Sequence, residues 1–165
     1  MGLDMYLAAT KRVEKINWER LQMNHTLSLD SPEIIEPQFS NLMELTQLTD
    51  VATDIYSASV QVTCAYWRKA NQIHNWFVTN IQDNVDNCRE YYVSRDKLLE
   101  LKTTCEKALN ERNPSLLPPA EGYFFGNDDI DQYYWQDIKD TIEQLNRILA
   151  LPNFNELTFS YQSSW

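Results

Sequence analysis

The chain has 165 residues, 43% apolar and 12% aromatic, so it can bury a core and is too apolar for global disorder. Its three glycines argue against a glycine-rich phosphate loop and against an all-β fold rich in tight turns. The formal net charge of −10 disfavours direct nucleic-acid binding, because an acidic surface repels phosphates over about 8 Å at physiological salt.

The cysteines indicate the compartment. Cys64, Cys88 and Cys105 are odd in number and form no Cys-x-x-Cys spacing, which is typical of free thiols in a reducing cytoplasm. No signal peptide is visible, and no apolar stretch approaches the roughly 20 residues that span a bilayer. We therefore expect a cytoplasmic chain that does not associate with a membrane.

Hydrophobic periodicity predicts the secondary structure. Alternation with a period of two predicts strands over residues 3–13, 55–65 and 157–162, with a short extended piece at 91–93. Helical spacing predicts a short helix opening near residue 18 and longer helices over 38–49, 66–81, 94–112 and 127–149. Ser94 is the expected N-cap of the 94–112 helix, and Asn127 or Asp128 that of the last helix.

These elements predict an α+β fold, in which a small, mostly antiparallel sheet carries three or four helices packed on one face. Residues 1–165 are predicted to form a single domain. Within it, residues 15–54 are rich in loop-forming residues and are predicted to be an insertion.

The stretch from Tyr66 to Ile81 carries the densest chemistry. On a helical wheel, Trp67, Asn71 and His74 fall on one shoulder of the predicted core face. An indole, an amide and an imidazole in a row suit a planar, nucleotide-like ligand. The alternative is that Trp67 and His74 pack at the edge of the sheet, with Arg68 and Lys69 in solvent. Further ligand-binding candidates are Arg68, Lys69, Tyr91 and Tyr92.

A second candidate surface precedes and opens the last helix. Asp128, Asp129 and Asp131 resemble a cation-binding run, but the calcium-loop pattern is incomplete, and carboxylates at a helix N-terminus are explained by the helix dipole. Tyr133 and Trp135 lie off the core stripe of that helix and are expected to be partly exposed. Exposed aromatic rings beside carboxylates suit a partner-binding surface, and the alternative is an aromatic-rich core.

Catalytic and metal motifs are absent from the sequence. No spacing gives His74 an orienting partner, and no nucleophile motif is present, so no catalytic residue is assigned and a non-enzymatic role is favoured. His25 and His74 are too far apart in sequence to argue a metal pair, so neither a metal nor a cofactor is expected.

Several blocks resemble a family of small proteins encoded by bacteriophages and prophages. These blocks are MGLDMYL, YWRKANQIHNWFV, EYYVSRDKL, and FFG followed by QYYWQDIKDTI. The resemblance covers about residues 1–8 and 66–149, and it leaves out the predicted insertion. It implies a phage context but brings no reaction and no residue roles.

The leading hypothesis is a phage-type accessory protein that binds a host protein in the bacterial cytoplasm. It would neutralise that factor, a defence component by analogy, through an acidic and aromatic surface. A first alternative is a pocket around His74 that sequesters or hydrolyses a nucleotide-like small molecule. A second is a structural or assembly role, and a homodimer is compatible with each hypothesis.

Overall fold

The computed structural model describes residues 2–29, 31–50, 55–120, 122 and 128–165. The chain divides into two compact units. The larger unit comprises Met1–Ala9 and Val62–Trp165, and the smaller unit comprises Thr10–Gln61. The residues of the predicted insertion, 15–54, all belong to the smaller unit. The FFG block of the phage resemblance lies outside the described residues.

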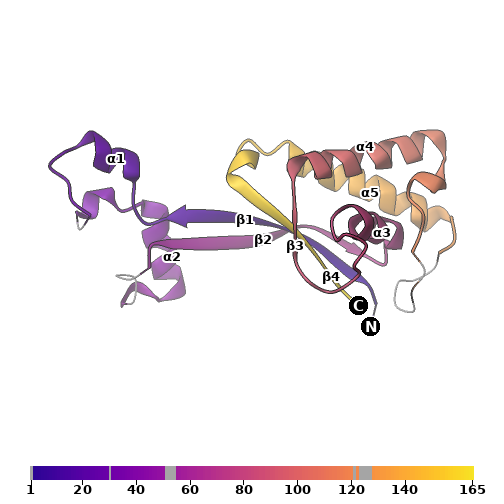
Figure 1. Ribbon diagram of the computed structural model, residues 1–165, viewed down its shortest axis with the longest axis horizontal. Helices are drawn as coiled ribbons and strands as arrows, with labels where there is room; N and C mark the ends of the chain where they lie inside the picture. Colours follow the sequence, from indigo (N-terminus) through magenta and orange to yellow (C-terminus); the bar gives the residue numbers. More distant parts are fainter. Residues whose placement is uncertain (1, 30, 51–54, 121, 123–127) are drawn as a thin grey trace. The chain divides into compact units, whose positions relative to one another are not determined.

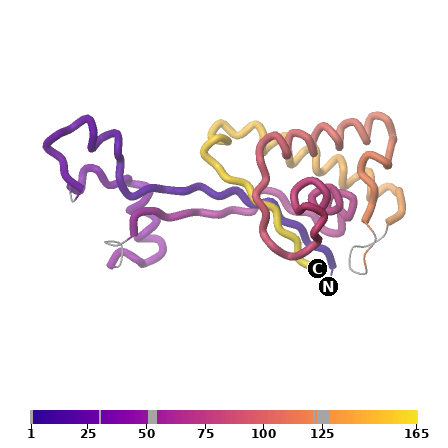
Figure 2. The backbone as a smooth tube through the Cα atoms, in the orientation of Figure 1, coloured from indigo at the N-terminus to yellow at the C-terminus, as the bar shows by residue number. Residues whose placement is uncertain are grey.

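A four-stranded antiparallel sheet organises the fold, with strand order β2-β1-β4-β3. The strands are β1 (Asp4–Glu14), β2 (Ser57–Arg68), β3 (Tyr91–Val93) and β4 (Leu157–Ser164). The first and last strands of the chain are therefore neighbours in the middle of the sheet, and the two ends of the chain lie together (Figure 2). In the register of β3 with β4, Tyr91 is opposite Tyr161.

Three helices cover one face of this sheet (Figure 1), which confirms the predicted α+β class. They are α3 (Asn71–Asn80), α4 (Arg95–Glu111) and α5 (Gln132–Leu149). Alternation at the start of β1 explains which face is covered, because Leu3, Met5 and Leu7 are fully buried whereas Asp4 and Tyr6 are partly exposed. Burying each such side chain contributes about 1.5–3 kcal/mol.

Short turns complete the larger unit. They are the 3-10 helices η3 (Pro114–Leu116) and η4 (Phe154–Glu156). Ser94 caps α4 as predicted, since its hydroxyl accepts a hydrogen bond from Lys97 N. Of the helices in the described residues, none has both the length and the apolar character needed to cross a membrane.

The predicted helix over residues 66–81 is wrong in its first third. Tyr66, Trp67 and Arg68 end β2, and α3 begins only at Asn71. The alternation of β2 continues through this stretch, because Ala65 and Trp67 are buried while Tyr66 and Arg68 are exposed. On a helical wheel Tyr66 would lie on the predicted core face, but in the strand it is exposed.

The last helix also begins later than predicted. Asp131, and neither Asn127 nor Asp128, is the N-cap of α5, and its side chain accepts hydrogen bonds from the backbone N–H groups of Tyr133 and Tyr134. A carboxylate at this position meets the unsatisfied amides and the positive end of the helix dipole. Four residues earlier, Asn127 lies outside the described residues.

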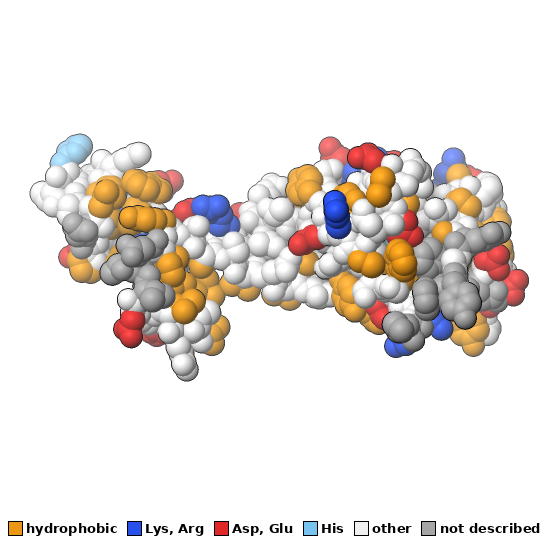
Figure 3. Space-filling view, turned by 60° about the horizontal axis from the view of Figure 1, so that its bottom comes forward, with side chains coloured by type: hydrophobic (Ala, Val, Ile, Leu, Met, Phe, Trp, Pro, Cys, Tyr) orange, Lys and Arg blue, Asp and Glu red, His pale blue; other side chains and the backbone are white. Residues whose placement is uncertain are grey.

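The smaller unit has a much smaller core. It contains α1 (Trp18–Met23), η1 (Pro32–Ile34) and α2 (Pro37–Thr46). Its buried cluster consists of Val13, Phe39 and Met43, whereas α1 buries none of its side chains. Hydrophobic side chains on the surface of this unit are visible at the left of Figure 3. Below about 70 residues, such a core supplies little stability on its own.

Lys69 is strained, and its replacement by glycine is expected to stabilise the fold. Its φ of 60° places a residue with a Cβ in the left-handed region, which costs about 1–2 kcal/mol. After allowing for the greater freedom of glycine in the unfolded chain, Lys69→Gly should raise the free energy of unfolding by about 0.5–1 kcal/mol, measured by urea denaturation. Lys69→Ala keeps the strain and should show no gain; an equal gain in both variants would contradict the explanation.

Candidate functional site

Trp67 and His74 are core residues in this structure. The side chain of Trp67 is 4% exposed and that of His74 is 0% exposed. Trp67 Nε1 donates a hydrogen bond of 2.8 Å to Thr141 Oγ1 on α5. The two residues stand on different elements, β2 and α3, so the helical face on which the sequence placed them together does not exist. They offer almost no surface to a ligand.

Burial of His74 is compensated by polar partners on both ring nitrogens. Nδ1 lies 2.7 Å from the Tyr161 hydroxyl on β4, and Nε2 lies 3.2 Å from Asp86 Oδ1. A carboxylate only accepts hydrogen bonds, so the closeness of Asp86 favours the tautomer with its proton on Nε2, in which Tyr161 donates to Nδ1. Trp165 Nε1 donates to the same Asp86 oxygen at 3.3 Å.

The His74 ring is held in its neutral form. Burial lowers the pKa of His74, because the charged imidazolium loses its hydration, and the hydrogen bond and charge of Asp86 oppose this shift. The neighbouring rings of Phe77 and Tyr161 stack, with their centroids 3.8 Å apart and an angle of 7° between their planes. His74 therefore links α3, β4 and the segment between α3 and β3 within the core.

Removing the Tyr161 hydroxyl should destabilise the fold. Tyr161→Phe keeps the stacked ring but leaves Nδ1 of a fully buried imidazole without its donor, which should cost about 1–2 kcal/mol of unfolding free energy. Chemical denaturation measures the loss. Tyr92→Phe, on the neighbouring strand with an exposed ring, is the matched control and should change little. Equal effects of the two substitutions would argue against the assigned network.

A pocket of about 320 Å³ lies where the end of β2 and the start of α3 meet the start of α5. This volume is at the lower end of the range for ligand pockets. The pocket unites Arg68, Lys69 and Asn71, predicted to bind a ligand, with Asp129, Asp131 and Tyr133, predicted to bind a partner. The remaining lining residues are Gln72, Tyr134 and Asp137.

The first wall is built by the corner between β2 and α3. Lys69 N donates a hydrogen bond of 2.8 Å to the carbonyl oxygen of Leu3, the residue before β1, and the left-handed backbone then turns the chain into α3. The Lys69 stem lies over Gly2, where a Cβ would come within 3.0 Å of Lys69 Cε. The guanidinium of Arg68 leans toward Asp4, with 3.9 Å between Arg68 Nε and Asp4 Oδ1.

Two buried amides line the pocket next to this corner. Asn71 and Gln72 open α3, and both side chains are buried. Gln72 Nε2 lies 3.2 Å from Tyr134 O and 3.3 Å from Asp137 Oδ2, both on α5. Gln72 is not among the residues predicted from the sequence, because on a helical wheel it points away from the predicted core face, whereas α5 covers that side of the helix.

The second wall is the first two turns of α5. Tyr133 is 69% exposed at the rim, whereas Tyr134 turns inward and donates from its hydroxyl to Leu117 O at 2.9 Å. Asp137 follows one turn later and is half-buried. It was missed as a candidate, although its position four residues after Tyr133 places it on the same side of a helix.

Asp137 is the most perturbed carboxyl group of the pocket. Burial raises its pKa to about 6, the hydrogen bond from Gln72 opposes the shift, and the negative charges of Asp140 and Asp131 add to it. The ionised carboxylate is thus only partly compensated by the fold.

The other predicted residues lie away from this pocket's lining. Asp128 is exposed, and Trp135 is half-buried with the Arg112 guanidinium 4.9 Å from its ring centroid. Tyr91 accepts a hydrogen bond of 2.9 Å from Asn87 Nδ2, and Tyr92 is exposed on β3. Among the residues described, no group of three or more acidic, histidine or cysteine side chains could hold a metal ion.

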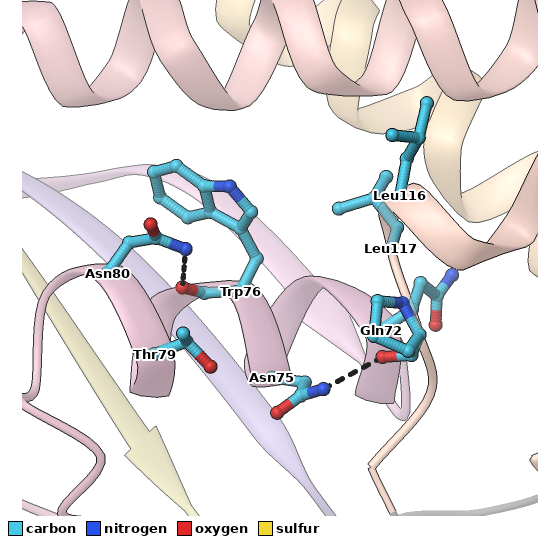
Figure 4. Close-up of a pocket in the computed structure, with 8 residues that line it drawn as sticks. Gln72, Asn75, Trp76, Thr79, Asn80, Leu116 and Leu117 are labelled. Carbon is cyan, nitrogen blue, oxygen red and sulfur yellow. Dashed lines mark hydrogen bonds between the residues drawn. The ribbon is translucent and has the colours of Figure 1, made fainter.

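A second, smaller pocket of about 140 Å³ lies between α3 and the segment around Leu117 (Figure 4). Asn75 Nδ2 donates to Pro118 O at 2.9 Å, and Asn80 Nδ2 donates to Trp76 O at 2.9 Å. Gln72 lines both pockets. Every residue that lines the smaller pocket is uncharged, so it offers a ligand apolar surface, amides and the hydroxyl of Thr79.

Neutralising Asp137 should stabilise the free protein at neutral pH. The pKa of Asp137 in the folded protein is about 6, above its ordinary value of 3.8. The ionised carboxylate therefore lowers the free energy of unfolding above pH 6, and this penalty disappears as the pH falls toward 4. Asp137→Asn should therefore gain about 1 kcal/mol at pH 7.5, after discounting for solvent screening, and little at pH 4. Urea denaturation at both pH values, with exposed Glu143→Gln as control, measures this; a gain that persists at pH 4 would refute it.

Comparison with protein-family models, curated proteins and solved structures finds no match to this chain. The functional argument therefore depends on the geometry and charge of the site.

Proposed function

We propose that the chain is a binding protein that recognises a host protein in the bacterial cytoplasm and neutralises it, as phage accessory proteins do. The observation that carries the proposal is the pocket at the start of α5. There Asp129, Asp131 and Asp137 gather with the exposed ring of Tyr133, in a chain whose net charge is −10. Exposed aromatic rings flanked by charges are typical of protein-binding surfaces.

One histidine and two cysteines, residue types that are common in catalysis, are partly or fully buried in the structure, which favours binding over turnover. His74 is closed off between Tyr161 and Asp86. Burial raises the pKa of Cys64 to about 11 and that of Cys105 to about 12, so both thiols stay protonated and weakly nucleophilic at neutral pH.

A nucleotide-like ligand is the second candidate, and the lining of the same pocket gives it some support. Arg68 and Lys69 could meet phosphates, the amides of Asn71 and Gln72 could meet a base, and Tyr133 could stack on it. Three carboxylates in that lining oppose an anionic ligand, and His74 does not contribute. For these reasons a protein partner is the stronger proposal.

Capture from a bacterial lysate tests the proposal at the level of single residues. The tagged chain is compared with Tyr133→Ala and Asp129→Asn, and with Tyr92→Ala and Glu143→Gln as exposed controls outside the pocket. A specific partner should be recovered with the wild type and with both controls, and at least tenfold less with the pocket variants, since hot-spot residues contribute about 2 kcal/mol or more.

Folding of every variant is checked by thermal melting, so that loss of the partner cannot reflect unfolding. Recovery of the same partner by the pocket variants and the wild type in equal amounts would contradict the proposed surface. Recovery of no specific partner, together with a thermal shift of the wild type by nucleotides, would instead favour the second candidate.

A further inference from the structure

The charged side chains that line the pocket differ in how many favourable partners the folded protein gives them. Arg68 leans toward Asp4 on β1, and the stem of Lys69 is held against Gly2. Asp131 uses Oδ1 to cap α5. Asp137 accepts a hydrogen bond from the Gln72 amide on Oδ2, and the charges of Asp131 and Asp140, which act on it, are both negative.

We infer that this pocket receives the side chain of one arginine of the bound partner, with its guanidinium against Asp137 and its stem beside Tyr133. The inference rests on the proposed function and specifies the group that is recognised. A half-buried carboxylate among other carboxylates is stabilised most by a cation that brings its own hydrogen-bond donors.

A guanidinium fits the lining better than an ammonium does. Its planar fork presents five N–H donors, two of which match the two oxygens of a carboxylate. The Tyr133 ring offers an exposed aromatic face on which a guanidinium stacks. An ammonium is a compact, strongly hydrated charge that would use only part of this arrangement.

Binding of the cation should be coupled to proton release. The titratable and charged groups that line the pocket with Asp137 are Lys69 and Arg68 from the β2–α3 corner, Asp129 before α5, and Asp131, Tyr133 and Tyr134 from α5 itself. The charge of Asp140 also acts on Asp137, and burial raises the pKa of Asp137 to about 6. Protonation of this carboxyl competes with the guanidinium, so affinity should fall about tenfold between pH 7.5 and pH 5.

The experiment titrates the full chain with Nα-acetyl-arginine amide, followed by NMR of the side-chain amide groups of Asn71 and Gln72. At pH 7.5 the expected Kd is on the order of 1 mM, from the usual efficiency of small ligands. Nα-acetyl-lysine amide should bind more weakly. Nα-acetyl-citrulline amide, which keeps the shape without the charge, should bind at least tenfold more weakly.

Asp137→Asn should weaken arginine binding at least tenfold and remove its dependence on pH, whereas Glu143→Gln should retain both. Equal binding of the citrulline and arginine compounds, unchanged binding by Asp137→Asn, or no shift of the two amides at 20 mM would each overturn the inference. The outcome is separable from the proposed function, because a partner that Tyr133→Ala loses in the lysate experiment would support that function even if the arginine compound did not bind.

Discussion

The left-handed backbone of Lys69 is the constraint on which both the core and the pocket depend. Lys69 N is hydrogen-bonded to Leu3 O, just before β1, and two residues later α3 has begun. A tight corner of this kind leaves Trp67 on the inner face of the sheet and turns Asn71 and Gln72 toward α5. Without the corner, the alternation of β2 would run on and the first wall of the pocket would not form. A non-glycine residue in such a conformation is strained, and strain of this kind concentrates at functional sites.

His74, which is buried, and Asp137, which is half-buried, have very different surroundings. His74 has a polar partner on each nitrogen and is held neutral, so its burial adds a specific link to the core at small electrostatic cost. Asp137 has one amide and two unfavourable neighbours, and its ionised form remains poorly compensated. The first arrangement is what a structural residue requires. The second lowers the stability of the free protein and leaves an interaction that a cationic partner can complete.

Local signals in the sequence were sufficient for the elements that are set by short-range patterns. Ser94 predicted the start of α4, and alternation predicted the two central strands of the sheet, β1 and β4. The failure came at residues 66–70, because aromatic and apolar residues there fit a helical wheel and a period of two equally well, and no glycine or proline marks the corner. Pairing with β1, a long-range interaction, decided between them.

Only some residues of the candidate site could be predicted from the sequence, and their proximity to one another could not. Lys69, Asn71, Asp131 and Tyr133 were each singled out, but on two surfaces, since nothing in a single sequence says that the start of α3 faces the start of α5. Gln72 and Asp137 join those two surfaces, and an isolated Gln or Asp on a helix carries no signal of such a role. For the same reason Tyr161 and Asp86 were not recognised as the partners of His74.

The distribution of tryptophan gives the two units separate optical signatures. Trp18, exposed on α1, is the one tryptophan of residues 10–61, whereas the other four belong to the larger unit, where Trp67 and Trp76 are buried. A variant that lacks the tryptophan of α1 would report through fluorescence on the larger unit alone. A variant that keeps only that tryptophan would report on the smaller unit. Comparing the two emission transitions would reveal whether the chain melts as one cooperative body or loses its smaller unit first.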